Sequence, residues 1–291
     1  MDIGIGLPAT IPGVTGGALV ESARRAERLG FSSLGTIDRL VYPNYEPLTA
    51  LAAAAAVTES IRLATTVLLA PLRSAALLAK QAATVDSLSG GRLVLGLAVG
   101  GRADDYEAAG VDFSKRGEIF DAQIEEMKQI WAGEQRGFAG GIGPAPSRSG
   151  GPTLVLGGTS EAAVRRTVQH GDGWIGPGGG PDTFKQTADA VRAAWSKAGR
   201  EGSPRFLALA YFSLGPEAKQ NADTYLKDYY GFTGPFAEQI AAGAATSEEM
   251  VKGYIDGYQQ VGCDELILFP CSADPDQVDL LAKAAGLSAR S

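Results

Sequence analysis

Short apolar runs alternate with amphipathic helical stretches along the whole chain. The runs that predict strands lie at 3–7, 31–36, 62–69, 93–99, 153–156, 173–175, 206–212 and 264–269. Helical spacing is found at 17–29, 47–58, 74–88, 118–131, 160–169 and 182–198, in a segment ending at residue 260, and at 275–285. This alternation is typical of a parallel sheet covered by helices. Eight strands with intervening helices predict an α/β fold, a (β/α)₈ TIM barrel, in which residues 1–291 form one domain.

Local signals support several of these boundaries. Ser74 is expected to cap the third helix, and Thr246 and Glu249 are spaced as a capping box for the helix that ends at residue 260. Glycines end four helices before the next strand, near residues 30, 90, 171 and 262. These junctions belong to the amino-terminal face of a barrel, where residues serve stability, so we interpret His170 as a structural residue at a helix end.

Two stretches interrupt the alternation and exceed ordinary loop length. Residues 134–151 form a long glycine- and proline-containing loop after the fourth helix, and residues 228–245 form an aromatic insertion before the last helix–strand unit. Loops of this length are usually lids, binding segments or disordered. The aromatic insertion could cover a flat ligand or lie in a subunit interface, whereas the first stretch could equally be a solvent-exposed loop.

Charge and composition exclude several classes of partner. The chain has 26 Lys and Arg against 33 Asp and Glu, a formal net charge of −7, which leaves no broad basic surface for nucleic acid or anionic lipid. The apolar stretch at 48–57 is mostly alanine and too short for a membrane span. The chain opens on a strand-like segment without a basic, apolar leader, and a cytoplasmic location is therefore expected.

Few residues are available for self-sufficient catalysis. There is one histidine and there are two cysteines, Cys263 and Cys271, so a zinc site, a disulfide framework and a Ser-His-Asp triad are all disfavoured and no metal is expected. No lysine ends a predicted strand, and no pair of carboxylates is placed for glycoside hydrolysis. This small set of reactive side chains predicts that a bound cofactor carries out the reaction.

The predicted strands end in glycine-rich turns. Active sites of barrels lie at the carboxyl ends of the strands. The residues found there are Asp38, Arg39 and Tyr42, then Arg73, then Gly100, Gly101 and Arg102, then Gly157, Gly158 and Thr159, and finally Gly176 and Pro177. Glycine turns that lead into helices expose backbone N–H groups to an anionic ligand, so a phosphate-bearing cofactor is predicted.

Three stretches carry a family resemblance. SLSGGRLVLGL at 87–97, followed by Gly100 and Gly101, resembles the central signature of the bacterial luciferase-like flavin oxidoreductases. IRLATTV at 61–67 and DGWI at 172–175 are similar to their corresponding strands, so the resemblance covers nearly the whole chain. It implies a TIM barrel that binds FMN, or the deazaflavin F420, at its carboxyl-terminal mouth, and it implies a homodimer.

The resemblance also assigns roles to residues. Thr66 and Val67 would pass behind the isoalloxazine ring through a cis peptide bond, and Gly100 and Gly101 would approach the ring or the ribityl chain. The phosphate would be held by Gly157, Gly158 and Thr159, and Gly176 and Pro177 would complete the cofactor site. Tyr42, Arg73 and Tyr106 are the candidates to line the substrate side.

The chain departs from the family pattern after the second strand. Many relatives have a histidine there, whereas this chain reads Ile37-Asp38-Arg39-Leu40. Arg39 could stabilise negative charge on the flavin, on its oxygen adduct or on an anionic substrate, with Asp38 orienting it. The alternative is a salt bridge at the rim of the barrel.

These observations favour an FMN-dependent monooxygenase that acts on a small organic substrate with O2. Because the chain has no GxGxxG dinucleotide fold, the reduced FMN would come from NAD(P)H or a partner flavin reductase. One alternative is F420-dependent hydride transfer, for which Arg39, Arg73 and Arg102 are a thin supply of positive charge. The others are a catalytically silent flavin-binding protein and an unliganded barrel with a structural role.

Overall fold

The computed structural model, described here over residues 1–289, has a closed parallel sheet. Its strands are β1 (Asp2–Gly6), β2 (Ser33–Thr36), β3 (Arg62–Thr65), β4 (Leu68–Leu69), β5 (Leu93–Ala98), β6 (Thr153–Gly157), β7 (Gly173–Ile175), β8 (Arg205–Phe212) and β9 (Glu265–Pro270). They are ordered β3-β2-β1-β9-β8-β7-β6-β5-β4, and pairing of β3 with β5 closes the ring. Because β3 and β4 share one position, the sheet is an eight-stranded barrel, and the predicted TIM barrel is confirmed.

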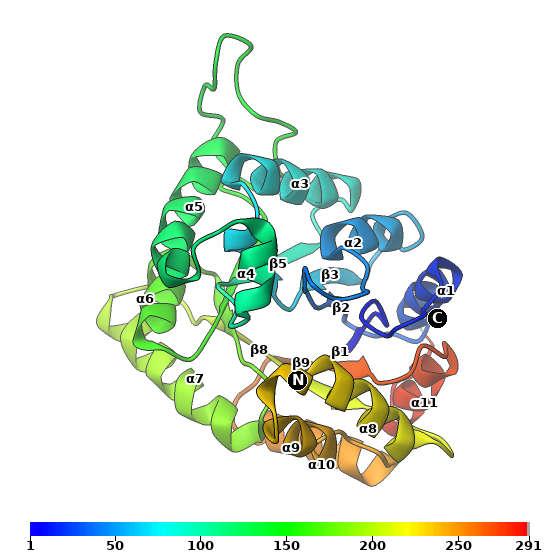
Figure 1. Cartoon of the computed structure of the whole chain (residues 1–291). Coiled ribbons are helices and arrows are strands. Elements are labelled where there is room, and N and C mark those ends of the chain that lie inside the picture. The colour runs from blue at the N-terminus through cyan, green and yellow to red at the C-terminus, as the bar shows by residue number, and fades with distance from the viewer. Residues whose placement is uncertain (290–291) are drawn as a thin grey trace.

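Helices surround the barrel (Figure 1). They are α1 (Gly16–Arg28), α2 (Pro47–Ala55), α3 (Ala75–Leu88), α4 (Ala103–Ala109), α5 (Arg116–Trp131), α6 (Glu161–His170), α7 (Gly180–Lys197), α8 (Ala218–Tyr229), α9 (Phe236–Ala242), α10 (Glu248–Gln260) and α11 (Asp276–Ala284). Within residues 1–289, no helix combines the length and the apolarity needed to cross a membrane.

Two buried layers hold the fold together. Alternate strand residues such as Val94, Val155 and Leu207 fill the barrel interior, and their neighbours pack outward against the helices. At the amino-terminal end of the barrel the carboxylate of Glu265, which is buried, pairs with Arg62 at 3.0 Å and Arg205 at 2.7 Å. These contacts close the end of the barrel opposite the glycine-rich turns.

The expected strand at 62–69 is interrupted. The peptide bond between Thr66 and Val67 is cis, as the family resemblance implied, and the ladder breaks there into β3 and β4. At this point the Thr66 N–H donates to the carbonyl of Thr36 at 2.8 Å. The Thr65 hydroxyl donates to the carbonyl of Gly96 at 2.7 Å, which fixes β3 against β5. The sequence prediction of one continuous strand was therefore wrong at its centre.

Other boundaries also differ from the sequence predictions. The cap of α10 is Ser247, whose hydroxyl accepts the N–H of Met250 at 3.2 Å, and not Thr246. The aromatic insertion contains the end of α8, a 3-10 turn at Gly231–Thr233 and the whole of α9, so most of it is helical rather than loop. Residues 134–151 do form a long loop, which extends from the end of α5 in Figure 1.

Candidate active site

A cavity of about 400 Å³ lies at the carboxyl ends of the strands. It brings together ten of the residues predicted for the site, namely Asp38, Arg39, Thr66, Val67, Gly100, Gly101, Gly157, Gly158, Gly176 and Pro177. They come from the ends of β2, β5, β6 and β7 and from the turn between β3 and β4. Closure of the barrel thus brings together residues that are spread over 140 positions of the sequence, from residue 38 to residue 177.

Six glycines line this cavity, namely Gly100, Gly101, Gly157, Gly158, Gly176 and Gly178. A Cβ atom placed on Gly157 would lie 3.2 Å from Cγ1 of Val67 and 3.3 Å from Cβ of Ala98, so these side chains fill the space beside it. Gly158 has a φ of +116°, a conformation that favours glycine. A Cβ atom on Gly101 would have no heavy atom within 4 Å, so the space that a flat ring system could approach lies beside Gly101.

Thr159 follows these glycines but does not line the cavity; it is exposed. The next residue, Ser160, caps α6 by accepting the N–H of Ala163 at 3.2 Å. A phosphate at this end of the cavity would meet the positive end of a ten-residue helix.

Asp38 is the buried anchor of the loop after β2. Its carboxylate accepts two hydrogen bonds from the Arg73 guanidinium, at 2.6 and 3.1 Å, and one from the N–H of Leu69 at 2.8 Å. Burial raises the pKa of the Asp38 carboxyl, and Arg73 and the Leu69 N–H oppose that rise. The structure therefore pairs Asp38 with Arg73, and the expected orientation of Arg39 by Asp38 is not found.

Arg39 is buried between two tyrosine rings. Its guanidinium carbon lies 4.6 Å from the ring centre of Tyr42 and 5.1 Å from that of Tyr229. Its terminal nitrogens donate to the carbonyls of Tyr229 at 3.0 Å and Val41 at 2.8 Å. The buried Nε has no hydrogen-bond partner among residues 1–289, although Arg39 lines the cavity. Burial lowers the pKa of Arg39, and the nearby charge of Arg102 lowers it further.

A second acidic residue, which lies in α4, also holds the loop after β2 in place. Asp105, which is fully buried, accepts the N–H groups of Leu40 at 3.0 Å and Val41 at 2.7 Å. Asp105 was not a predicted site residue because α4 was not predicted. The sequence does contain a signal for α4, since two acidic residues lie in its first turn, where carboxylates favour a helix start.

An aromatic wall that the sequence analysis did not place closes one side of the cavity. It consists of Tyr211 from β8 and Tyr229, Tyr230 and Phe232 from the aromatic insertion. The hydroxyls of Tyr211 and Tyr230 share a hydrogen bond of 2.7 Å, and burial holds the pKa of Tyr211 well above its ordinary value. The side chain of Arg102 lies over the Phe232 ring at 4.0 Å. The insertion therefore contributes to the cavity, one of the two roles considered for it.

The three residues expected on the substrate side lie behind the cavity wall. Tyr42 packs edge-on against Tyr229, with ring centres 5.1 Å apart, and Arg73 is held by Asp38. Tyr106 is buried, donates its hydroxyl to the Val99 carbonyl and packs on Phe113. Each supports residues of the cavity without lining it.

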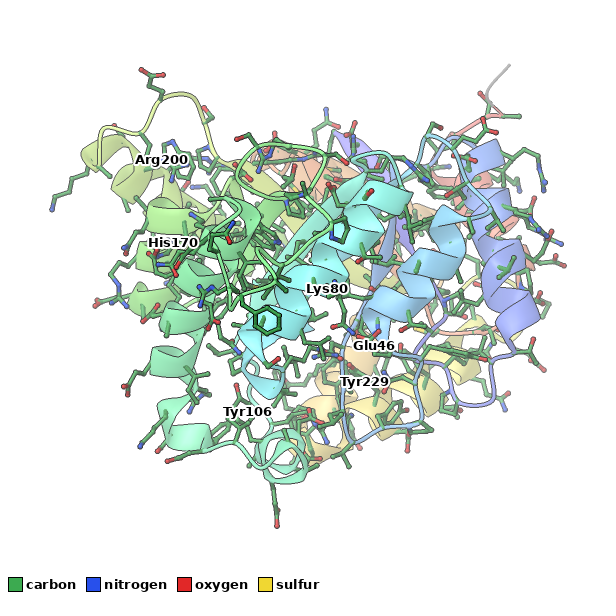
Figure 2. The ribbon with its side chains drawn as sticks, turned by 90° about the horizontal axis from the view of Figure 1, so that it is seen from above. Glu46, Lys80, Tyr106, His170, Arg200 and Tyr229 are labelled. Carbon is green, nitrogen blue, oxygen red and sulfur yellow. The ribbon has the colours of Figure 1, made fainter. Side chains whose placement is uncertain are left out.

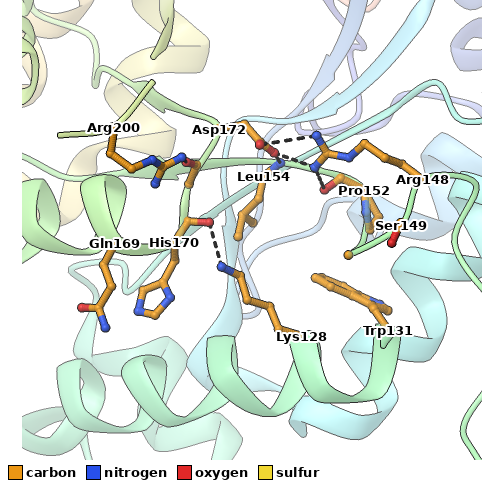
Figure 3. A pocket seen from close by; sticks show the side chains of 12 residues that line it. Lys128, Trp131, Arg148, Ser149, Pro152, Leu154, Gln169, His170, Asp172 and Arg200 are labelled. Atoms are coloured by element: carbon orange, nitrogen blue, oxygen red, sulfur yellow. Dashed lines mark hydrogen bonds and ion pairs between the residues drawn. The ribbon is translucent and has the colours of Figure 1, made fainter. Parts of the chain in front are cut away.

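A cavity of about 420 Å³ with several cationic side chains lies at the opposite end of the barrel (Figure 3). Figure 2 shows the two ends, with Tyr106 and Tyr229 at one and His170 and Arg200 at the other. The cations are engaged by the chain itself: Lys128 Nζ donates to the His170 carbonyl at 3.1 Å, and Arg200 to the Gly171 carbonyl at 3.0 Å. This arrangement supports the structural interpretation of His170.

His170 is expected to titrate below its ordinary pKa of about 6.5, because burial and the positive charge of Lys128 both disfavour the imidazolium. Since the folded chain holds the imidazole neutral, the unfolded chain binds the proton first as the pH falls. This residue therefore reduces stability progressively as the pH falls through about 6.5. The chain has a single histidine, so one C2–H resonance followed by NMR against pH measures the value directly. A midpoint at or above 6.5 would contradict the assignment.

Comparison with known proteins adds a family to this geometry. A family model described as luciferase-like monooxygenase matches residues 1–265. An uncharacterised protein of Mycobacterium tuberculosis is 32% identical over 206 residues, covering 61% of this chain and 71% of that protein. The pyrimidine monooxygenase RutA of Cronobacter turicensis is 31% identical over 176 residues, covering 54% of this chain and 45% of that protein.

Solved structures share the fold at low identity. The monooxygenase RslO1 from Streptomyces bottropensis superposes with a TM-score of 0.76 at 22% identity, covering 99% of this chain and 97% of that one. An F420-dependent secondary alcohol dehydrogenase superposes with a TM-score of 0.78 at 18% identity, with 97% of each chain covered. The oxygenating constituent of 3,6-diketocamphane monooxygenase from Pseudomonas putida, in complex with FMN, has a TM-score of 0.72 at 15% identity, covering 98% of this chain and 97% of that one.

Proposed function

The chain belongs to the luciferase-like monooxygenase family, and from this premise we propose that it is a monooxygenase that binds reduced FMN and oxidises a small organic substrate with O2. The observation that carries the proposal is the makeup of the cavity at the carboxyl ends of the strands. Six glycines and an aromatic wall line it, and Asp38, which supplies the one carboxylate among its described lining residues, is paired with Arg73. Such a site offers a flat ligand a close fit but supplies little acid–base chemistry itself.

The residues present fit a flavin mononucleotide. Gly157 and Val67 would lie against the ring system, and Gly158, Thr159 and the first turn of α6 would hold the phosphate. The unpartnered Nε of Arg39 would donate to a negatively charged atom of the cofactor or substrate, an interaction that stabilises developing charge in a dry site. When bound, reduced FMN supplies the two electrons that activate O2.

The remaining groups position these residues and exclude water. Asp38 and Arg73 hold the loop after β2, and Asp105 holds its next two N–H groups. Tyr229, Tyr230 and Phe232 cover the cavity from the aromatic insertion, which shields reactive species from solvent. A partner reductase or NAD(P)H would supply the reduced cofactor.

F420-dependent hydride transfer is the second candidate. It is favoured by the likeness over 97% of both chains to the F420-dependent secondary alcohol dehydrogenase. F420 has a longer anionic tail than FMN and would need more positive charge, whereas the terminal nitrogens of Arg39 and Arg102, the arginines that line the cavity, are engaged by carbonyls and by Asp104. This thin supply of positive charge is the reason that we propose FMN rather than F420.

Side-by-side titrations distinguish the candidates. We expect the purified chain to bind reduced FMN more tightly than oxidised FMN or either form of F420, measured anaerobically by fluorescence. On addition of O2, we expect the bound reduced FMN to be reoxidised at a rate different from that of free reduced FMN, which reacts with O2 by itself. A preference for F420 would replace the proposal with hydride transfer. Flavin binding with the reoxidation rate of free reduced FMN would indicate a silent flavin-binding protein, and binding of neither cofactor would refute both enzymatic candidates.

A further inference from the structure

A second cavity, of about 590 Å³, adjoins the first. It lies between the first turn of α7, the end of β8 and helices α9 and α10. Pro177, Gly178, Tyr211 and Tyr230 line both cavities. The hydrogen-bonded pair of tyrosine hydroxyls and the Pro177–Gly178 turn therefore form a common wall. We name this space, between α7, α9 and α10, the side chamber.

The side chamber is built for a ring without charge. None of the described residues that line it has a charged side chain, so a carboxylate or phosphate would be desolvated without a counter-charge. Its walls include the rings of Tyr211, Tyr230, Phe236, Tyr254 and Tyr258. A volume of several hundred Å³ lined by aromatic side chains is typical of sites for small planar molecules.

A few polar groups would orient such a ring. The side chains of Thr183 and Gln239 line the chamber. Helix α7 has 18 residues and begins at Gly180 without a side-chain cap, and Gly180 also lines the chamber. A carbonyl oxygen of the ligand would be favoured at this positive helix end. The Tyr254 hydroxyl donates to the Gly243 carbonyl and so fixes the opposite wall.

Gly178 lies where the two cavities meet. A Cβ placed there would have Leu209 Cδ1, at 3.8 Å, as its nearest neighbour, so the space beside this glycine is open. Leu209 itself lines the first cavity. A ligand seated in the side chamber can therefore extend along Gly178 toward the cofactor pocket.

We propose that the side chamber binds the non-reacting part of the substrate, a neutral planar aromatic or heterocyclic ring with a carbonyl acceptor, while the reacting end extends past Gly178. As a statement about substrate, this rests on the proposed function. As a statement about a ligand site, it is testable on the chain without any cofactor.

The probe is 6-propionyl-2-dimethylaminonaphthalene, a neutral planar ketone whose emission shifts to the blue in an apolar site. We expect Ile240→Trp, which fills the chamber from α9, to weaken probe binding at least about tenfold, or about 1.4 kcal/mol. Gln239→Trp, at a more exposed lining position, is expected to act in the same direction. Glu238→Trp adds the same ring to the same helix at an exposed position that lines neither cavity, and is expected to change binding less than twofold.

Competition tests the stated chemistry. 2-Acetylnaphthalene is expected to displace the probe at a concentration at least about tenfold lower than 2-naphthoate, which carries a charge. Equal competition by the two compounds would overturn the assignment of a neutral ligand. Unchanged probe binding in both Ile240→Trp and Gln239→Trp, with the folded state verified by circular dichroism, would overturn the site itself.

Adding FMN distinguishes probe binding in the side chamber from probe binding in the first cavity. It also separates this inference from the proposed function. With FMN saturating, probe binding is expected to persist, whereas complete displacement of the probe by FMN would place it in the cofactor pocket and overturn the inference. If FMN does not bind, the proposed function fails, and the comparison of Ile240→Trp with Glu238→Trp still decides whether the side chamber takes a neutral ring.

Discussion

A Gly157→Val variant is expected to bind reduced FMN at least about 100-fold more weakly than the parent chain, a loss of about 2.7 kcal/mol. The first added carbon would lie 3.2 Å from Val67 Cγ1, 3.3 Å from Ala98 Cβ and 3.6 Å from Ile175 Cγ2. These three residues line the cavity, so the added carbons would push their side chains into the space that we propose for the cofactor ring. The backbone at residue 157 is not in the left-handed region, which leaves the chain conformation accessible to valine.

The matched control is Gly253→Val on the exposed side of α10. A Cβ at that position would have no heavy atom within 4 Å, and the residue lines neither cavity. Anaerobic titration with reduced FMN measures both variants, and circular dichroism verifies that each is folded. FMN affinity within about threefold of the parent in Gly157→Val would show that the ring does not lie against β6.

The barrel itself was predictable because its strands and helices have simple hydrophobic periods. Strands buried on both faces are continuously apolar, as in β5 and in β9 after Glu265, and several of the helices between them begin at recognisable caps. Helix α8 has the same signal in Ala222, Tyr225, Leu226 and Tyr229, which are buried at helical spacing. No helix was predicted there, and the aromatic insertion at 228–245 includes only the last two residues of α8.

The glycines of the site were also predictable, because a turn that leads from a strand into a helix at the carboxyl end of a barrel has few other uses. The pairing of the polar side chains was not predictable from the sequence. Asp38 and Arg73 are 35 positions apart, and which of Arg39, Arg73 and Arg102 binds Asp38 depends on how β2 pairs with β3 in the barrel. Residue types give the candidates for an ion pair, but only the packing selects one.

The aromatic wall was also not predictable from residue types alone. Tyr211 lies near the end of β8 and Tyr230 directly follows α8, 19 positions later. Each sequence signal by itself is that of an ordinary buried aromatic residue. Their hydrogen bond joins the aromatic insertion to β8 and forms part of the wall between the first cavity and the side chamber.

An Arg73→Met variant is expected to lower the free energy of unfolding by about 3–5 kcal/mol, because it leaves the Asp38 carboxylate buried without its counter-charge. The Asp38 side chain is 2% exposed, and Arg73 supplies two of its three hydrogen bonds. Asp38→Asn is expected to lower the free energy of unfolding by less, about 1–3 kcal/mol, because Arg73 retains its ion pair with Glu46, at 3.2 Å. The double variant should then cost less than the sum of the two single changes.

Equilibrium urea unfolding measures each variant, and Arg165→Met is the matched control. Arg165 pairs with Asp121 at 3.4 Å, but both side chains are largely exposed, so its loss is expected to cost at most about 1 kcal/mol. A cost for Arg73→Met no greater than that of Arg165→Met would refute the anchoring role of the Asp38–Arg73 pair. Strict additivity of Asp38→Asn and Arg73→Met would do the same. The pair holds the loop that carries Arg39, so a large coupling energy would mean that the cavity at the carboxyl ends of the strands depends on an ion pair between Asp38, which lines it, and Arg73, which lies behind its wall.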